Sequence, residues 1–178
     1  VVDFETAMDP LSPYYPSYGD IDNNYAGFTW DTPGQEFNRV SDVNHWDDML
    51  HTKVSGNHVA YIQDGDLEGV ISRSDGSSFD VFGGYWSSRA QHEDVTLSFY
   101  SNDGHVLEDV AISHTDTTWI DINFSDIEEL KVVVDRPGYD ATYIALDNFS
   151  YSSSGTTVTE GDEGGSGQLT IADVDDGE

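Results

Sequence analysis

The sequence predicts an all-β protein, an antiparallel β-sandwich of jelly-roll type with about ten strands. Helical periodicity is weak along most of the chain, whereas short runs of β-branched and aromatic residues recur between Gly, Asn, Asp and Pro. The chain of 178 residues is long enough for one well-packed core with appendages and too short for two full domains. Many short strands in one such domain are typical of a sandwich or jelly roll.

Ten segments show the composition and alternation of strands. They are residues 1–5, 27–30, 58–63, 69–73, 79–87, 94–101, 106–113, 118–124, 130–135 and 142–151. In the segment 79–87, the pair Gly83-Gly84 would weaken a strand unless it marks a bulge or a close approach of another backbone.

The connections indicate antiparallel neighbours. Asn102-Asp103-Gly104 supplies the positive φ of a tight hairpin, and Pro137-Gly138 fits a type II turn. Two connections, 6–26 and 31–57, are much longer, and long ordered loops are often functional. Because antiparallel strands alternate in direction, we expect the loop 6–26 at one end of the sandwich with the loops around residues 64–68, 88–93, 114–117 and 136–141.

The charge is strongly acidic, with 35 Asp and Glu against 6 Lys and Arg and a formal net charge of -29. Such a charge excludes nucleic acid and anionic membrane surfaces as partners. The aromatic content of 12% is too high for a disordered acidic chain. Grouping of acids with Gly and Asn in loops predicts several bound Ca²⁺ ions, while adaptation to high salt remains the alternative. The chain has no cysteine, so calcium is a candidate cross-link in place of disulfides.

Two loops carry oxygen ligands at spacings that suit calcium. Asp64, Asp66 and Glu68 lie in the stretch D-G-D-L-E-G, which matches the start of a calcium loop, although no flanking helix is evident and a plain Asp/Gly turn is equally consistent. Asp20, Asp22 and Asn23 form a second cluster within a Tyr/Pro-rich loop. Asp140 is expected at the same end of the sandwich.

Aromatic and basic residues beside these loops are candidates for ligand binding, because aromatic rings next to a cation can hold a hydroxylated or anionic group. The predicted ligand-binding residues are Tyr18, Tyr25, Tyr85, Trp86, Arg89 and Tyr139. The alternatives are that the tyrosines only cover the end of the sandwich, that Tyr85 and Trp86 pack in the core, and that Arg89 pairs with an acid.

Three stretches, Phe4-Glu5, V-S-G-N-H-V-A-Y and I-A-L-D-N-F-S-Y, resemble a family of bacterial extracellular jelly rolls found in exported proteins and adhesins. In related carbohydrate-binding sandwiches, an acid on the first strand and an acid on the last strand hold a structural Ca²⁺. The resemblance implies that Glu5 and Asp147 form this pair here. Otherwise Glu5 is a solvent-facing edge residue and Asp147 caps a turn with Asn148.

The last 22 residues, from Thr157 to Glu178, resemble the opening of a VCBS-type repeat, a β-sandwich module strung in arrays in giant bacterial surface proteins. We therefore predict two parts: a ligand-binding domain over 1–152, and over 153–178 a linker with the first strand of a repeat as a short β tail. The resemblance implies an extracellular RTX-type adhesin with neighbouring repeat domains as partners.

Known catalytic patterns are missing from the sequence. The six His residues lack zinc-site spacing, no G-x-S-x-G motif occurs, and no apolar stretch is long enough to span a membrane. The sequence thus predicts a non-catalytic, calcium-dependent module of a surface adhesin. By resemblance to adhesin domains, its expected ligand is the C-terminal peptide of a cell-surface protein. A carbohydrate-binding module and a structural spacer are the alternatives.

Overall fold

The computed structural model describes residues 1–6, 18–21, 24–32, 35–36, 39–42, 50–62, 68–88, 95–135 and 144–154. For residues 18–20, 31–32, 35–36, 39–42 and 50 it describes the backbone only. The predicted β tail falls outside this part of the chain, as does the Pro137-Gly138 turn.

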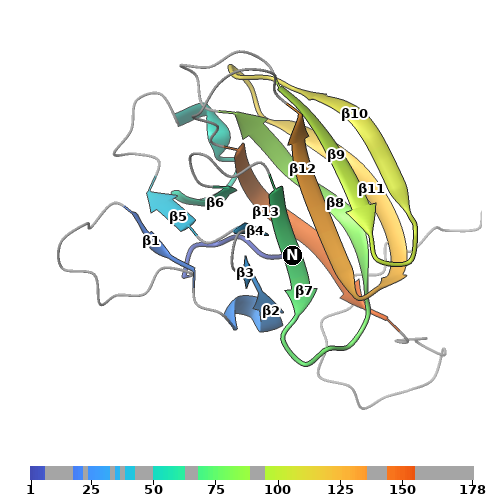
Figure 1. Cartoon of the computed structure of the whole chain (residues 1–178). Helices are drawn as coiled ribbons and strands as arrows, with labels where there is room; N and C mark the ends of the chain where they lie inside the picture. Colours follow the sequence, from blue (N-terminus) through green and yellow to red (C-terminus); the bar gives the residue numbers. More distant parts are fainter. Residues whose placement is uncertain are drawn as a thin grey trace, which may run out of the picture.

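The described strands form a sandwich of two antiparallel sheets, which confirms the predicted fold class (Figure 1). The six-stranded sheet has the order β1 (Tyr18–Asp20), β5 (Arg39–Asp42), β6 (His58–Ile62), β13 (Ile144–Ser153), β8 (Phe79–Ser88) and β11 (Thr118–Ile127). The five-stranded sheet has the order β10 (Val106–Ile112), β9 (Val95–Ser101), β12 (Glu129–Asp135), β7 (Glu68–Arg73) and β2 (Phe28–Thr29).

Smaller elements complete the described chain. A two-stranded hairpin joins β3 (Asp31–Thr32) to β4 (Gln35–Glu36). The helical segments in this part of the chain are the 3-10 turns η1 (Tyr25–Gly27) and η3 (Leu50–Thr52). None of the described helices is long and apolar enough to cross a membrane.

The strands β6 to β13 agree with the predicted ones to within a few residues at each end. The predicted hairpin at Asn102-Asp103-Gly104 is confirmed, with Gly104 at φ 98°. The predicted strand over 1–5 is wrong, because only Val2 forms a bridge, to Phe149. Phe4 has φ 60°, which turns the chain out of the extended conformation just before Glu5.

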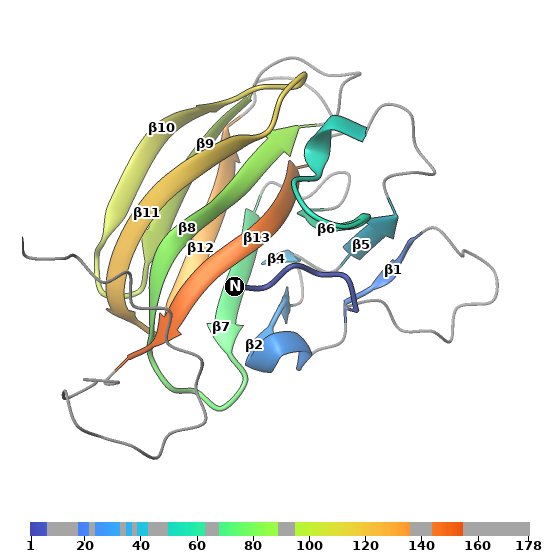
Figure 2. The same cartoon turned by 180° about the vertical axis from the view of Figure 1, so that it is seen from behind.

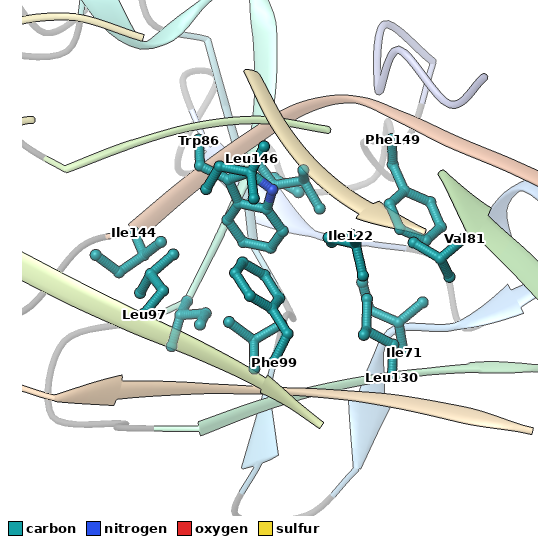
Figure 3. Close-up of a cluster of buried hydrophobic side chains, with 14 of the residues drawn as sticks. Ile71, Val81, Trp86, Leu97, Phe99, Ile122, Leu130, Ile144, Leu146 and Phe149 are labelled. Atoms are coloured by element: carbon teal, nitrogen blue, oxygen red, sulfur yellow. The ribbon is translucent and has the colours of Figure 1, made fainter. Parts of the chain in front are cut away.

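The core fills the space between the two sheets because alternate residues of each strand point inward. Trp86 from β8 packs against Phe99 from β9, with ring centroids 5.2 Å apart (Figure 3). Another aromatic group surrounds Phe28, whose ring lies 5.1 Å from Phe79 and 5.8 Å from Phe149. Leu146 and Phe149 of β13 are fully buried in the same core.

The glycine pair in β8 marks close approaches, as the sequence predicts. A Cβ on Gly83 would lie 2.1 Å from the backbone oxygen of Ile120 in β11. A Cβ on Gly84 would lie 2.7 Å from the Leu146 side chain. Both positions therefore need glycine, and β8 sits tightly between β11 and β13.

Both β10 and β11 lie at sheet edges and both are bulged. Their registers shift near Asp109 in β10 and near Asn123 and Asp126 in β11, and these three residues have positive φ values between 55° and 58°. Asp and Asn tolerate this conformation better than other side chains with a Cβ. Bulged, acidic edges discourage pairing with a strand of another molecule.

Candidate functional site

The candidate site lies on the outer face of the six-stranded sheet, where two rows of residues run across three strands. Cα pairing places Asp147 of β13 opposite Tyr85 of β8, and Tyr85 opposite Trp119 of β11. Their neighbours Leu146, Trp86 and Ile120 belong to the core, so this first row points outward. Figure 2 shows β11, β8 and β13 side by side on this face.

The second row is one step along the strands. It contains Ser150 of β13, Gly83 of β8 and Asp121 of β11. Since Gly83 has no side chain, the middle of this row is open to a neighbouring ring. The two rows together bring one buried carboxylate, two aromatic rings and one exposed carboxylate onto a single face.

One half of this face, the covered half, is formed by β6 and the start of β13. Residues 50–57, which we call the covering segment, lie against it, because the N–H groups of Val54 and Ser55 donate to Asp147 of β13. The segment is also fixed at the end of β8, where a ring nitrogen of His51, Nε2, is 2.8 Å from the backbone oxygen of Ser88. Val59 and Ala145 point outward here, yet both are buried and contact each other. The covered half is therefore a second, smaller apolar layer.

Asp147 is fully buried at the border of the covered half. Its Oδ2 accepts hydrogen bonds from the backbone N–H groups of Val54, at 2.7 Å, and Ser55, at 3.0 Å, while Oδ1 accepts from Asn148 N at 2.7 Å. Burial raises the pKa of Asp147, and the nearby charge of Glu5 raises it further, although the three N–H donors oppose this. A raised carboxyl pKa means that the stability it contributes is lost as the pH rises through that pKa.

Glu5, on the N-terminal segment, is a second acid that binds the covering segment. Its Oε1 accepts hydrogen bonds from Asn57 N at 2.7 Å and His58 N at 2.8 Å, and its Oε2 lies 3.4 Å from His58 Nδ1. Burial acts to raise the pKa of Glu5, but the His58 and Asn57 N–H groups outweigh it, so the pKa is lowered. A Cβ on Gly56 would lie about 2 Å from the Glu5 carboxyl carbon, so the covering segment wraps closely around this acid.

The family resemblance implied that Glu5 and Asp147 together hold a calcium ion. The charge of Glu5 acts on Asp147, and the shared ion stays a prediction. The backbone at both sites is unusual, since Phe4 and Asn148 have φ values of 60° and 51°. Carboxylate oxygens such as those of Glu5 and Asp147 are the ligands that a hard cation such as Ca²⁺ prefers. Both carboxylates already accept backbone N–H groups of the covering segment. The described residues contain no group of three or more acids and histidines that could hold a metal, so further ligands would have to be other oxygen donors.

The other half, the bare half, is formed by β8 and β11. The Trp119 side chain is 36% exposed, although tryptophan is usually buried. Its Nε1 donates a hydrogen bond of 2.7 Å to Asp121 Oδ1, which fixes the rotation of the indole. A Cβ on Gly83 would come within 2.9 Å of Trp119 Cζ2, so the indole lies over Gly83. The glycine thus lets the ring lie low against the sheet.

Tyr85 supports this arrangement from the next strand. Its ring centroid is 5.1 Å from that of Trp119, with the two planes at 69°. Such an edge-to-face contact is favourable and limits the motion of both rings. Phe82 of β8 is 45% exposed and adjoins Gly83, at the position where the pairing of β8 with β13 shifts register. The bare half is therefore an exposed, pre-ordered aromatic surface.

The remaining predicted site residues are either outside the described part of the chain or away from this face. Seven lie outside the described residues and stay predictions: Asp22, Asn23, Asp64, Asp66, Arg89, Tyr139 and Asp140. Tyr18 and Asp20 are described by their backbone only, in β1. Glu68 forms an ion pair of 2.8 Å with Lys131 on the five-stranded sheet. The loops expected to gather at one end lie mostly in the undescribed segments too.

Two predicted ligand-binding aromatics are placed in the packing of the domain. Trp86 is fully buried between the sheets, so its ring offers no surface to a ligand, because inward alternation along β8 points it into the core. Tyr25 packs against the core beside Phe4, with ring centroids 6.1 Å apart. Of the predicted aromatics with described side chains, Tyr85 is the one on the outer face.

Trp119 was missed as a binding residue. The signal was present, because the run Trp119-Ile120-Asp121-Ile122 alternates, and its apolar core positions are the two isoleucines. A tryptophan in the polar phase of a strand, two residues from an aspartate, is therefore expected on the surface.

Comparisons with solved structures find chains of similar fold, including the following two. TmCBM61 in complex with β-1,4-galactotriose has 13% identity and a TM-score of 0.40, over 85% of this chain and 94% of that one. The CBM22-1–CBM22-2 tandem domain of Paenibacillus barcinonensis Xyn10C has 12% identity and a TM-score of 0.42, over 86% of this chain and 44% of that one. No family model and no curated protein matches the chain.

Proposed function

We propose that this domain is a non-catalytic carbohydrate-binding module that binds glycans on the bare half of its six-stranded sheet. The observation that carries the proposal is the Trp119 indole, which is partly exposed, hydrogen-bonded to Asp121 and laid over Gly83. The exposed part of this tryptophan is held in one orientation on the sheet. It provides a flat apolar surface for a ligand at a small cost in ordering.

The chemistry of the bare half suits a sugar. The C–H face of a pyranose can stack on the indole, while its hydroxyl groups need polar partners around the ring. Asp121 is an acceptor beside the indole, and the Tyr85 and Ser150 hydroxyl groups occupy neighbouring positions in the two rows. Because Tyr85 and Trp119 meet at 69°, they form a corner, not a flat plane. This shape favours a single soluble glycan chain over a crystalline surface.

Catalysis is not part of the proposal. Glycoside hydrolysis by the usual route needs two carboxyl groups flanking the bond that breaks. Within the described part of the bare half, the indole is paired with one carboxylate, Asp121.

Calcium has a structural role in this proposal. Glu5 and Asp147 would hold the ion, which would supply positive charge between two acids and tie the N-terminal segment to β13. The support is that Glu5 and Asp147 are both anchored to the same covering segment, through N–H groups of Asn57 and Val54, and that carboxylate oxygens are the ligands that Ca²⁺ prefers. We also propose that the module belongs to a longer extracellular protein. Binding of C-terminal peptides, adhesin membership and the tail's role as the start of a repeat stay predictions.

The function is tested by replacing Trp119 with Ala and measuring affinity for a panel of soluble polysaccharides by affinity electrophoresis and calorimetry. The wild-type protein should bind at least one polysaccharide, and Trp119→Ala should weaken that binding about tenfold or more, because an aromatic contact contributes about 0.5–1.5 kcal/mol beyond the area it buries. Val106→Ala is the control, since Val106 is an exposed apolar residue of β10 on the other sheet. Equal binding by Trp119→Ala and wild type would place the site elsewhere, and no binding to any glycan would refute the function.

A further inference from the structure

We infer that the bare half selects glycans that carry protonated amines, that is, chains of amino sugars, with the ammonium group on Asp121 and the sugar ring on Trp119. This inference rests on the proposed function and specifies the ligand class of the same site. It comes from the charges around the indole, which are unusually one-sided.

The first observation is the state of Asp121. One oxygen, Oδ1, accepts the indole N–H of Trp119 at 2.7 Å, which holds the carboxylate at the edge of the ring. The side chain is exposed, and among the contacts of the described residues its other oxygen, Oδ2, has no protein partner. A ligand stacked on the indole thus meets a pre-positioned carboxylate acceptor. A protonated amine makes a stronger, charge-assisted hydrogen bond to it than a hydroxyl group does.

The second observation is the composition of the three strands that form the site. β8, β11 and β13 contain four aspartates, Asp80, Asp121, Asp126 and Asp147, and they contain no Lys or Arg. The basic residues with described side chains are held elsewhere. Arg73 and Lys131 lie on the five-stranded sheet and pair with Asp75 and Glu68, and Lys53 binds Asn57 in the covering segment.

These negative charges disfavour anionic ligands and favour cationic ones. Anionic sugars, such as uronates or sulfated units, would bring a negative charge beside Asp121 into the field of a chain with net charge -29. A cationic sugar gains from that field, from the Asp121 carboxylate and from the face of the indole, since tryptophan is the best aromatic partner for a cation. Neutral sugars gain from stacking and hydroxyl contacts alone.

The size of the preference is limited by exposure to water. An exposed ion pair and an exposed cation–π contact are each weak, so together they correspond to about a five- to tenfold preference for the amine over its N-acetylated form. The preference should fall with added salt, which screens exposed charges.

The test compares two soluble oligosaccharides of equal length, one of glucosamine and one of N-acetylglucosamine, at a mildly acidic pH at which the amine is protonated. Calorimetry measures the ratio of their affinities for the wild type, Asp121→Asn, Glu108→Gln and Trp119→Ala. Asp121→Asn keeps an oxygen for the Trp119 N–H but removes the charge. Glu108→Gln removes one charge from β10, where Glu108 accepts a hydrogen bond from Tyr100, and is the matched control.

We expect the wild type to prefer the glucosamine chain about five- to tenfold, Asp121→Asn to bring that ratio close to one, and Glu108→Gln to leave it unchanged. Equal affinity for both chains, or tighter binding of the acetylated one, would overturn the inference and leave the proposed function standing. Equal losses in Asp121→Asn and Glu108→Gln, or full binding of glucosamine by Trp119→Ala, would also overturn it, because only general charge attraction would then be at work. Failure to bind either chain overturns the inference, and the polysaccharide panel then decides the function separately.

Discussion

The covered and bare halves belong to the same face of the same antiparallel sheet, but the outward side chains are buried in one half and exposed in the other. On β13 and β6, the outward-pointing Ala145 and Val59 are buried, and the polar Asp147 is buried with them. On the neighbouring strands β8 and β11 of the same sheet, Phe82 and Trp119 are large, apolar and exposed. Tyr85 stands at the border, directly between Asp147 and Trp119 in the pairing.

The difference shows that strand alternation alone does not decide which outward side chains are structural. The covering segment supplies Val54 and Ser55 as hydrogen-bond donors to Asp147, so the polar group there has its partners inside the protein. Asp121 on the bare half accepts a hydrogen bond from the exposed Trp119, which is its one partner among the residues that the structure describes. We therefore expect changes in the covered half to reduce stability and changes in the bare half to reduce binding.

The largest effect is expected from Asp147→Ala. The change removes three hydrogen bonds that the half-buried N–H groups of Val54, Ser55 and Asn148 donate to a buried carboxylate. Each is worth about 1 kcal/mol, so the free energy of unfolding should fall by about 3 kcal/mol. Urea denaturation measures this loss, and Asp135→Ala, at the exposed end of β12, should cost little. A variant as stable as the wild type would contradict the structural role of this carboxylate.

The same variant examines the calcium proposal. Calcium should raise the melting temperature of the wild type, a chelator should reverse the rise, and Asp147→Ala should not respond, because ligand binding stabilises only a folded state that holds the site. Sodium chloride at equal ionic strength is the control. If it stabilises the wild type as much as calcium does, salt adaptation explains the acidic surface and the ion at Glu5 and Asp147 is refuted.

A smaller effect on stability, combined with an effect on binding, is expected from Gly83→Ala. The new Cβ would meet the Ile120 oxygen and the Trp119 ring, so β8 and β11 must separate slightly at a cost of about 1–3 kcal/mol. The displaced indole should also bind glycan several-fold more weakly. Gly76→Ala is a useful comparison, because Gly76 has a positive φ of 73° but open space around it. Gly76→Ala should lower stability without changing the affinity for glycan. If Gly76→Ala and Gly83→Ala lose affinity equally, the loss is a general effect of destabilisation, and Gly83 is not part of the site.

The sequence predicts the sandwich well because its main signals are local. The alternation in 118–124 and the turn at Asn102-Asp103-Gly104 depend on neighbouring residues, and both are found as expected. The covering segment could not be predicted in this way, because its contacts with Asp147 join residues about 93 positions apart. The pair Glu5 and Asp147 was reached through family resemblance alone.

The candidate binding site was predicted only in part. Tyr85 was identified from its aromatic character, but Trp86 was grouped with it because adjacent residues look equivalent until the phase of the strand is fixed. Which residues of β8 point outward becomes clear only from the pairing of β8 with β11, which brings Trp119 and Asp121 next to Tyr85 and Gly83. Cross-strand contacts, and not the residues themselves, make this surface.

The most direct test of the binding claim is the indole N–H signal of each tryptophan, followed by NMR while a bound oligosaccharide is added. The Trp119 signal, assigned by its loss in Trp119→Phe, should shift with ligand concentration, because its ring is exposed and its N–H points at Asp121. The signals of Trp30 and Trp86 should stay in place, since both rings are fully buried. A saturable shift of Trp119 with these two unmoved is the predicted result, and an unmoved Trp119 signal at saturating ligand would contradict the account.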